Sequence, residues 1–193
     1  MNVQPIIELS VWESAVDIRG RVTFDGVVPE GEWEYVCGSM YGGAWEHQGA
    51  IFSAHRCLCV LDNTCNNGWT DCGLGPAMEV ATRRSGSHYR GPGGPLRVQP
   101  PPQDYQDLEL LQTAVGAHCL TRETTCRIIV RPYLLVDGNT VVQEFEFDTF
   151  DPPRAAFAGI IADVPILCVE FDLADGEDCG YQFINDFHYG RTR

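Results

Sequence analysis

Alternating apolar and polar residues between positions 126 and 148 give the clearest structural signal in the chain. In residues 126–136, CRIIVRPYLLV, the even positions are mostly apolar, whereas Arg127 and Arg131 occupy odd positions. A side-chain period of two is typical of a half-buried β-strand. The residues DGN at 137–139 tolerate the positive φ of a tight hairpin turn. Because the alternation resumes in residues 140–148, we predict two paired antiparallel strands.

Other segments alternate in the same way and predict further strands. These segments are residues 7–11, 16–25, 33–37, 50–61 and 180–190. Residues 164–173 are almost continuously apolar, which is typical of a central strand buried on both faces. An isolated hairpin is only marginally stable in water, so we expect these segments to supply the surface on which it packs.

Two segments carry signals of a short helix rather than of a strand. In residues 104–116, Leu108, Leu111 and Val115 share one face; an aspartate can cap the start and a glycine can end the helix. A second short helix is predicted over residues 153–162, where prolines follow an aspartate.

The order of these elements favours a mainly β protein. Twenty Gly and twelve Pro indicate many turns, so we predict an antiparallel β-sandwich with one or two short helices and a disulfide-braced loop. An immunoglobulin-like layout is one option. Residues 83–103 are rich in Pro and Gly and are predicted to be irregular. We expect one domain over residues 1–193; the alternative is two domains, 1–90 and 103–193, joined by this segment.

The charge of the chain limits its partners. The formal net charge is −14, and all 13 basic residues are Arg. Without lysine the chain has no Schiff-base nucleophile and no phosphate-binding P-loop lysine. An acidic protein repels phosphate backbones, so we expect no nucleic-acid partner.

Nine cysteines are unusual for a protein kept in a reducing compartment, and they favour an extracellular or surface location. The first 20 residues show no signal peptide, which leaves the export route open. No apolar run is long enough to predict a transmembrane segment.

The densest cysteine group is Cys57, Cys59, Cys65 and Cys72. On one strand, Cys57 and Cys59 would have Cα atoms about 6.5–7 Å apart. That separation is at the limit for a disulfide, so we predict that each bonds elsewhere, with Cys65 and Cys72 as candidates. The spacing does not match paired Cys-x-x-Cys zinc motifs, although a zinc or iron–sulfur site is an alternative.

The remaining cysteines suggest one local bridge and one odd thiol. Cys119 and Cys126 are close enough in sequence to pair across a turn. An odd count in a secreted chain implies an intermolecular bond or a free thiol, and the candidates are Cys37 and Cys179. The alternative is a buried unpaired cysteine that packs as a small apolar residue.

One acidic turn could bind a metal ion. Its carboxylates are Asp172, Asp175, Glu177 and Asp178. Calcium prefers such oxygen ligands, but the spacing is not that of an EF-hand loop, and most acidic runs are solvated turns. We therefore expect no cofactor, with calcium as the alternative.

Searches for catalytic motifs give nothing. The sequence contains no Gly-x-Ser-x-Gly elbow, no His-Glu-x-x-His and no Gly-x-Gly-x-x-Gly after a strand. We therefore expect a protein that is not an enzyme.

Three functions remain after these exclusions. The first is a structural subunit of an extracellular filament, coat or appendage, which would self-associate through its terminal strands. The second is a carbohydrate- or protein-binding module that uses exposed aromatic residues such as Trp33 and Trp69. The third is a metal-binding or redox protein that uses the cysteines between positions 57 and 72.

Overall fold

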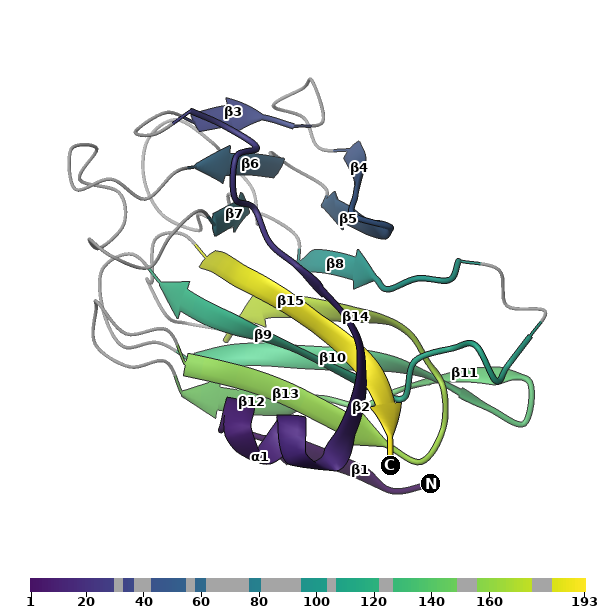
Figure 1. Cartoon of the computed structure of the whole chain (residues 1–193). Coiled ribbons are helices and arrows are strands. Elements are labelled where there is room, and N and C mark those ends of the chain that lie inside the picture. Colours follow the sequence, from purple (N-terminus) through teal and green to yellow (C-terminus); the bar gives the residue numbers. More distant parts are fainter. Residues whose placement is uncertain are drawn as a thin grey trace.

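A computed structural model of the whole chain shows two antiparallel β-sheets packed face to face (Figure 1). The structure describes residues 1–29, 33–36, 43–54, 58–61, 77–80, 95–103, 107–121, 127–148, 156–174 and 182–193. This arrangement confirms the predicted antiparallel β-sandwich. None of the described helices is long and apolar enough to cross a membrane.

The first sheet has eight strands and contains both ends of the chain. Its order is β1-β13-β9-β15-β7-β6-β3. One edge of β15 is shared by two strands, because β7 pairs with residues 182–184 and β2 pairs with residues 187–192. The strands are β1 (Val3–Ile6), β2 (Val16–Val22), β3 (Trp33–Tyr35), β6 (Leu58–Leu61), β7 (Ala77–Val80), β9 (Ala114–Thr121), β13 (Ala156–Ala162) and β15 (Gln182–Thr192).

The second sheet has seven strands in the order β11-β10-β14-β8-β5-β4, and β12 also pairs with β10. The strands are β4 (Gly43–His47), β5 (Ala50–Ala54), β8 (Leu96–Gln99), β10 (Arg127–Val136), β11 (Asn139–Val142), β12 (Phe145–Asp148) and β14 (Ile166–Leu173).

The core lies between the two sheets and is built from the side chains that point inward from the strands of both sheets. Phe52 of the second sheet contacts Phe187 of the first edge to face, with ring centroids 6.4 Å apart. Phe24 also contacts Phe52 edge to face, at 5.6 Å between ring centroids. All three phenylalanines are fully buried. Because such large apolar side chains leave water on folding, they hold the two layers together.

A smaller second core lies on the outside of the eight-stranded sheet, under the helix α1 (Leu9–Ala15). Trp12 is fully buried there and packs edge to face on Phe157, at 6.0 Å between ring centroids. Figure 1 shows this helix against β13, beside β1 and β2.

The hairpin predicted over residues 126–148 is present. Strand β10 pairs with β11 through a turn at Asp137 and Gly138, both of which have positive φ. Ile128, Val130 and Leu134 are fully buried, as their even positions predicted. The central strand predicted over residues 164–173 is also present, as β14.

The first predicted strand is wrong, because residues 9–15 form α1 and the edge strand β1 ends at Ile6. The apparent alternation at 7–11 is short, and Ile7 and Val11 are exposed. What orders this segment is Trp12, whose burial fits a helix lying on the sheet.

In the second predicted strand, over residues 16–25, strict alternation places Ile18 on the same face as Val22. That prediction is wrong, because Ile18 is 44% exposed and Val22 is fully buried. The adjacent residues Tyr189 and Gly190 of β15 pair with Gly20 and Ile18 of β2, so β2 contains one extra residue between them. A slip of one residue moves a side chain to the other face of a sheet. Val16 therefore packs outside the sheet with Trp12, whereas Val22 packs in the main core.

Three further sequence predictions are corrected by the strand order. Residues 50–61 form two strands, β5 and β6, which belong to different sheets. The segment 83–103, predicted to be irregular, contains β8, which lies between β14 and β5. The helix predicted at 104–116 is absent, because residues 107–113 form turns, bends and irregular backbone and β9 begins at Ala114. In the segment 153–162, the described residues 156–162 form the strand β13 instead of a helix.

Replacing Gly190 by alanine is expected to destabilise the contact between the two ends of the chain. A Cβ there would overlap the carbonyl oxygen of Asp17 and lie 2.6 Å from Val16 Cγ1, so backbone must move. We expect a loss of about 1–3 kcal/mol of unfolding free energy, measured by urea denaturation. Gly20→Ala is the matched control, because there the clash is with the movable ring of Tyr189. Equal losses in the two variants would contradict this explanation.

Candidate functional site

The outer face of the seven-stranded sheet carries two neighbouring groups of polar contacts. Strand alternation creates this face: Val98, Val169 and Phe171 point into the core and are fully buried. Their neighbours in sequence therefore point outward from β8 and β14. The outward residues Arg97, Arg131, Tyr133, Glu144, Cys168, Glu170 and Asp172 are called the polar face below.

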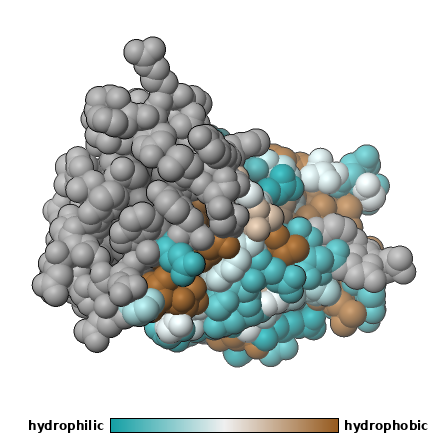
Figure 2. Space-filling model, turned by 90° about the horizontal axis from the view of Figure 1, so that it is seen from above, coloured by the Kyte–Doolittle hydropathy of each residue, from teal (hydrophilic) through white to brown (hydrophobic). Residues whose placement is uncertain are grey.

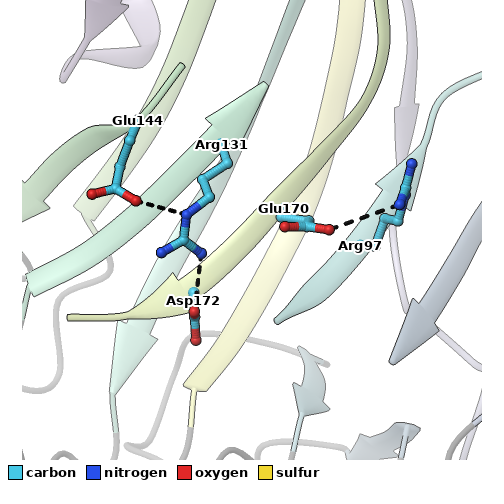
Figure 3. A network of polar contacts seen from close by, with 5 residues as sticks. All are labelled: Arg97, Arg131, Glu144, Glu170 and Asp172. Carbon is cyan, nitrogen blue, oxygen red and sulfur yellow. Dashed lines mark hydrogen bonds and ion pairs between the residues drawn. The ribbon is translucent and has the colours of Figure 1, made fainter. Parts of the chain in front are cut away.

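Arg131 is the centre of the first contact group on this face (Figure 3). Its Nε lies 2.7 Å from Glu144 Oε2, and its Nη1 lies 3.0 Å from Asp172 Oδ2. The guanidinium thereby links strand β10 to β14 and to the turn before β12. Arg127 donates a similar bond of 2.8 Å to Glu146 at the margin of the face.

Arg97 is the centre of the second group. Its guanidinium lies over the ring of Tyr133, 4.5 Å from the ring centroid, and its Nη1 is 3.8 Å from Glu170 Oε1. A cation over an aromatic face is stabilised by the ring quadrupole. The Arg97 side chain is 48% exposed, so its outer surface remains open to a ligand.

The Tyr133 phenol and the Cys168 thiol beside Arg97 are both held neutral. Burial raises the pKa of Tyr133, and its hydrogen bond to Glu170 raises it further. Burial also raises the pKa of the Cys168 thiol to about 11, against the opposing effect of Arg97. At neutral pH the phenol and the thiol are therefore protonated, and Cys168 is not an activated nucleophile.

The charges on and beside the polar face are paired across neighbouring strands. In the ion pairs of this sheet, three guanidinium groups lie against four carboxylates. Such a surface has no excess positive charge to attract phosphates or other polyanions. It offers many N–H donors and carboxylate acceptors, which suits an uncharged ligand with many hydroxyl groups.

The described part of the face seen from above is of mixed character. In the view from above, hydrophilic residues cover most of the coloured area, with hydrophobic residues between them (Figure 2). A surface of this kind does not by itself identify a binding site. The candidate site is therefore the polar face, which is defined by its contacts.

Of the acidic residues proposed for calcium, Asp172 is described, and it forms the ion pair with Arg131. Asp175, Glu177 and Asp178 lie outside the described residues, so the calcium site stays a prediction. Trp33 belongs to β3, but its side chain is not described, and Trp69 lies outside the described residues.

The structure gives the state of two cysteine thiols. Cys119 is free and 1% exposed on the inner face of β9, which differs from the predicted bridge to Cys126. Its side chain packs in the main core as a small apolar residue. Cys168, which the sequence did not single out, is free and buried as well. Cys59 is in β6 without a described side chain; Cys37, Cys57, Cys65, Cys72, Cys126 and Cys179 lie outside the described residues.

Sequence reasoning missed the polar face. Arg97 lies in the segment predicted to be irregular, and Tyr133 was one residue among many in a strand. Only the order β10-β14-β8 brings them to Glu170. The signal that was available is the alternation itself, which places Arg97, Arg131 and Glu170 on the solvent side of their strands.

Comparisons with known proteins give distant structural similarities. No protein-family model and no curated protein matches the sequence. One similar solved structure contains the CBM22-1–GH10 modules of the Clostridium thermocellum endo-1,4-β-D-xylanase 10B complexed with xylohexaose. The identity is 10% and the TM-score 0.46, over 91% of this chain and 29% of that chain.

Two other similar structures are of a family 11 carbohydrate-binding module. CtCBM11 in solution has 9% identity and a TM-score of 0.26, over 86% of this chain and 97% of that chain. The same family's module from Clostridium thermocellum, in complex with a β-1,3-1,4-mixed-linked tetrasaccharide, has 10% identity and a TM-score of 0.17, over 79% and 93%. Similarity of this degree does not tell what this chain binds.

Proposed function

We propose that this chain is a non-catalytic carbohydrate-binding module that holds a neutral polysaccharide on the polar face. The observation that carries the proposal is the pair of contact groups around Arg97 and Arg131, which cover three adjacent strands with fixed donors and acceptors. Such a module would act where polysaccharides occur, outside the cell.

The chemistry of the face fits sugar hydroxyl groups. Each hydroxyl both donates and accepts, so it can bond a guanidinium N–H and a carboxylate oxygen at once. The ion pairs hold Arg131 and Arg97 in place before the ligand arrives, which lowers the entropy lost on binding. Because these charged groups are already paired with one another, an uncharged ligand does not leave an unpaired ion behind.

The dimensions of the face fit a chain rather than one sugar. Strands in a sheet are about 4.8 Å apart, so side chains on β10, β14 and β8 span roughly 10 Å. An extended oligosaccharide that crosses the strands would meet Tyr133 and Arg131 first, then Glu170, then Arg97.

A structural subunit that self-associates through its two terminal strands fits the topology less well. Strand β15 lies inside its sheet, paired with β9 on one edge and with β2 and β7 on the other. Its backbone groups are therefore already used and are not available to a neighbouring sheet edge. Of the two terminal strands, β1 lies at the sheet edge and pairs with one strand, β13, among the described residues.

Replacing Arg97 by alanine is expected to weaken saccharide binding at least tenfold while leaving the fold intact. The change removes the guanidinium over Tyr133 and a donor for sugar hydroxyls. Xylohexaose, the β-1,3-1,4-mixed-linked tetrasaccharide and a neutral glycan array are the probes, with isothermal titration calorimetry as the measurement. Arg19→Ala, an exposed arginine on β2 of the other sheet, is the matched control and should bind like the unaltered protein.

Two results would count against this function. One is the absence of binding to every neutral glycan on the array. The other is binding that Arg97→Ala and Tyr133→Ala leave unchanged, which would move the site away from the polar face. Repeating the titration with a chelator and with added calcium tests whether the predicted acidic turn contributes.

A further inference from the structure

Two histidines and an aspartate converge on the outer side of the eight-stranded sheet, on the opposite layer from the polar face. They are His118 of β9 with Asp186 and His188 of β15. One ligand atom from each residue lies within 4.8 Å of the others. This is the one group of three or more potential metal ligands found among the described residues.

A β-bulge creates the convergence. The pairing of β15 with β9 shifts register between Asn185 and Phe187, and the inserted residue, Asp186, has φ of 50°. Aspartate tolerates this left-handed conformation better than most residues do. The bulge lets Phe187 enter the main core, while Asp186 and His188 share the side occupied by His118.

The buried, unpaired ring nitrogen of His188 points to a ligand. The residue is 3% exposed, and its Nε2 is buried without a hydrogen-bond partner. The ring packs between Trp12 and Phe157, with centroids 6.0 and 6.1 Å away. Leaving a buried polar atom unpaired costs about 1–3 kcal/mol, so a native site of this kind calls for a missing partner.

We propose that His118, Asp186 and His188 form a binding site for a divalent first-row transition metal, with Zn²⁺ as the best probe. Two imidazole nitrogens and one carboxylate oxygen are ligands that zinc accepts at about 2.0–2.2 Å. Ligand atoms around a tetrahedral zinc lie roughly 3.4 Å apart, so the three side chains, whose ligand atoms lie within 4.8 Å of one another, must move closer by rotation when the ion binds. His118 is half-buried, so the ion can enter from its side and keep a water as fourth ligand.

Arg21 of β2 provides a distinctive test of this site. Its guanidinium is paired with Asp186 Oδ2, which leaves the second carboxylate oxygen for an ion. The positive charge of Arg21 opposes a bound cation. Removing that charge should therefore tighten metal binding, whereas removing any of the three ligands should weaken it.

The experiment is a Zn²⁺ titration of chelator-treated, reduced protein by calorimetry, with Co²⁺ absorption to identify the ligands. We expect one ion per chain, a cobalt spectrum without thiolate charge transfer, and at least tenfold weaker binding in His118→Ala and in Asp186→Asn. Arg21→Gln should bind several-fold more tightly. His47→Ala, a histidine of the other sheet, is the control and should bind as the unaltered protein does.

Cysteines are the competing ligands, and the design separates them from the proposed site. Binding that shows thiolate charge transfer and survives His118→Ala would overturn the proposal, as would no binding of Zn²⁺ or Co²⁺. His118 and Asp186 are only partly buried, so these variants are expected to fold; circular dichroism of each variant checks this.

Discussion

Replacing Trp12 by alanine is expected to lower the free energy of unfolding by about 3–5 kcal/mol, the range for removing a buried tryptophan. The side chain is fully buried and joins α1 to Phe157 of β13 and to His188 of β15. Its removal would leave a cavity in a core of six buried residues, which has few neighbours able to fill the space. For a chain of this length, the midpoint of thermal unfolding should fall by roughly 10 °C.

Chemical denaturation measures the effect. It is followed by far-ultraviolet circular dichroism, so that the signal does not depend on the tryptophan that is removed. Val11→Ala is the matched control, because Val11 lies on the same helix and is 46% exposed. Its replacement should change stability by less than about 0.5 kcal/mol. If Trp12→Ala were equally mild, α1 would not be an integral layer of the fold.

This prediction could not have come from the sequence, where Trp12 sits at the end of an apparent strand. A period-two pattern over only five residues does not distinguish a strand edge from one turn of an amphipathic helix. The hairpin around Asp137 and Gly138 was predictable because 20 residues of alternation agreed with a turn that demands positive φ. The hairpin was predictable and the helix was not, because the alternation was long and agreed with the turn in the hairpin, whereas at residues 7–11 it was short.

Bulges account for a second class of failure. The register shift at Asp186 breaks the two-residue repeat of β15, and the shift opposite Tyr189 and Gly190 breaks the repeat of β2, where Arg19 is the extra residue. Across the bulge, Ile184 and Phe187 are both fully buried, although strict alternation would place positions 184 and 187 on opposite faces. Periodicity cannot reveal such an insertion, because the inserted residue reads as one more strand position.

The predicted helices failed for a related reason. The segment ending in β9 has three apolar residues at helical spacing, but Val115 is buried as a strand residue, whereas Leu108 is 50% exposed. Strand β13 is buried along its whole length because the main core covers one face and α1 covers the other. A run of small apolar residues of this kind is ambiguous between a strand and a helix until its neighbours are known.

Both candidate sites depend on strand order and so could not be located from sequence. His118 and His188 are 70 positions apart and meet only because β9 and β15 are neighbours. Arg97 reaches Glu170 and Tyr133 in the same way, across β8, β14 and β10. The two sites lie on opposite outer faces of the sandwich, so loss of metal and loss of saccharide binding should be separable by mutation.

The stability of the metal-free protein is expected to fall as the pH drops from about 6.5 towards 4, because of His188. Burial first, then the charge of Arg21, lower the pKa of His188 from 6.5 to about 4, while Asp186 acts in the opposite direction. Between these values the unfolded chain binds a proton that the folded chain does not, so acid favours unfolding. The difference corresponds to up to about 3 kcal/mol, fully present above pH 6.5 and lost by about pH 4.

The groups around His188 define the control for this effect. Arg21 faces it from β2, Asp186 from its own strand and His118 from β9, while Glu13 of α1 acts on His118. Burial lowers the pKa of His118 as well, so His118→Gln should remove a further part of the slope. Denaturation curves of the unaltered protein and of His188→Gln, both with chelator, should converge as the pH falls. The comparison is of the change in unfolding free energy with pH, not of its absolute value. A variant that is less stable at neutral pH therefore still tests the effect of His188. Parallel curves would mean that His188 is solvated or charged in the folded state.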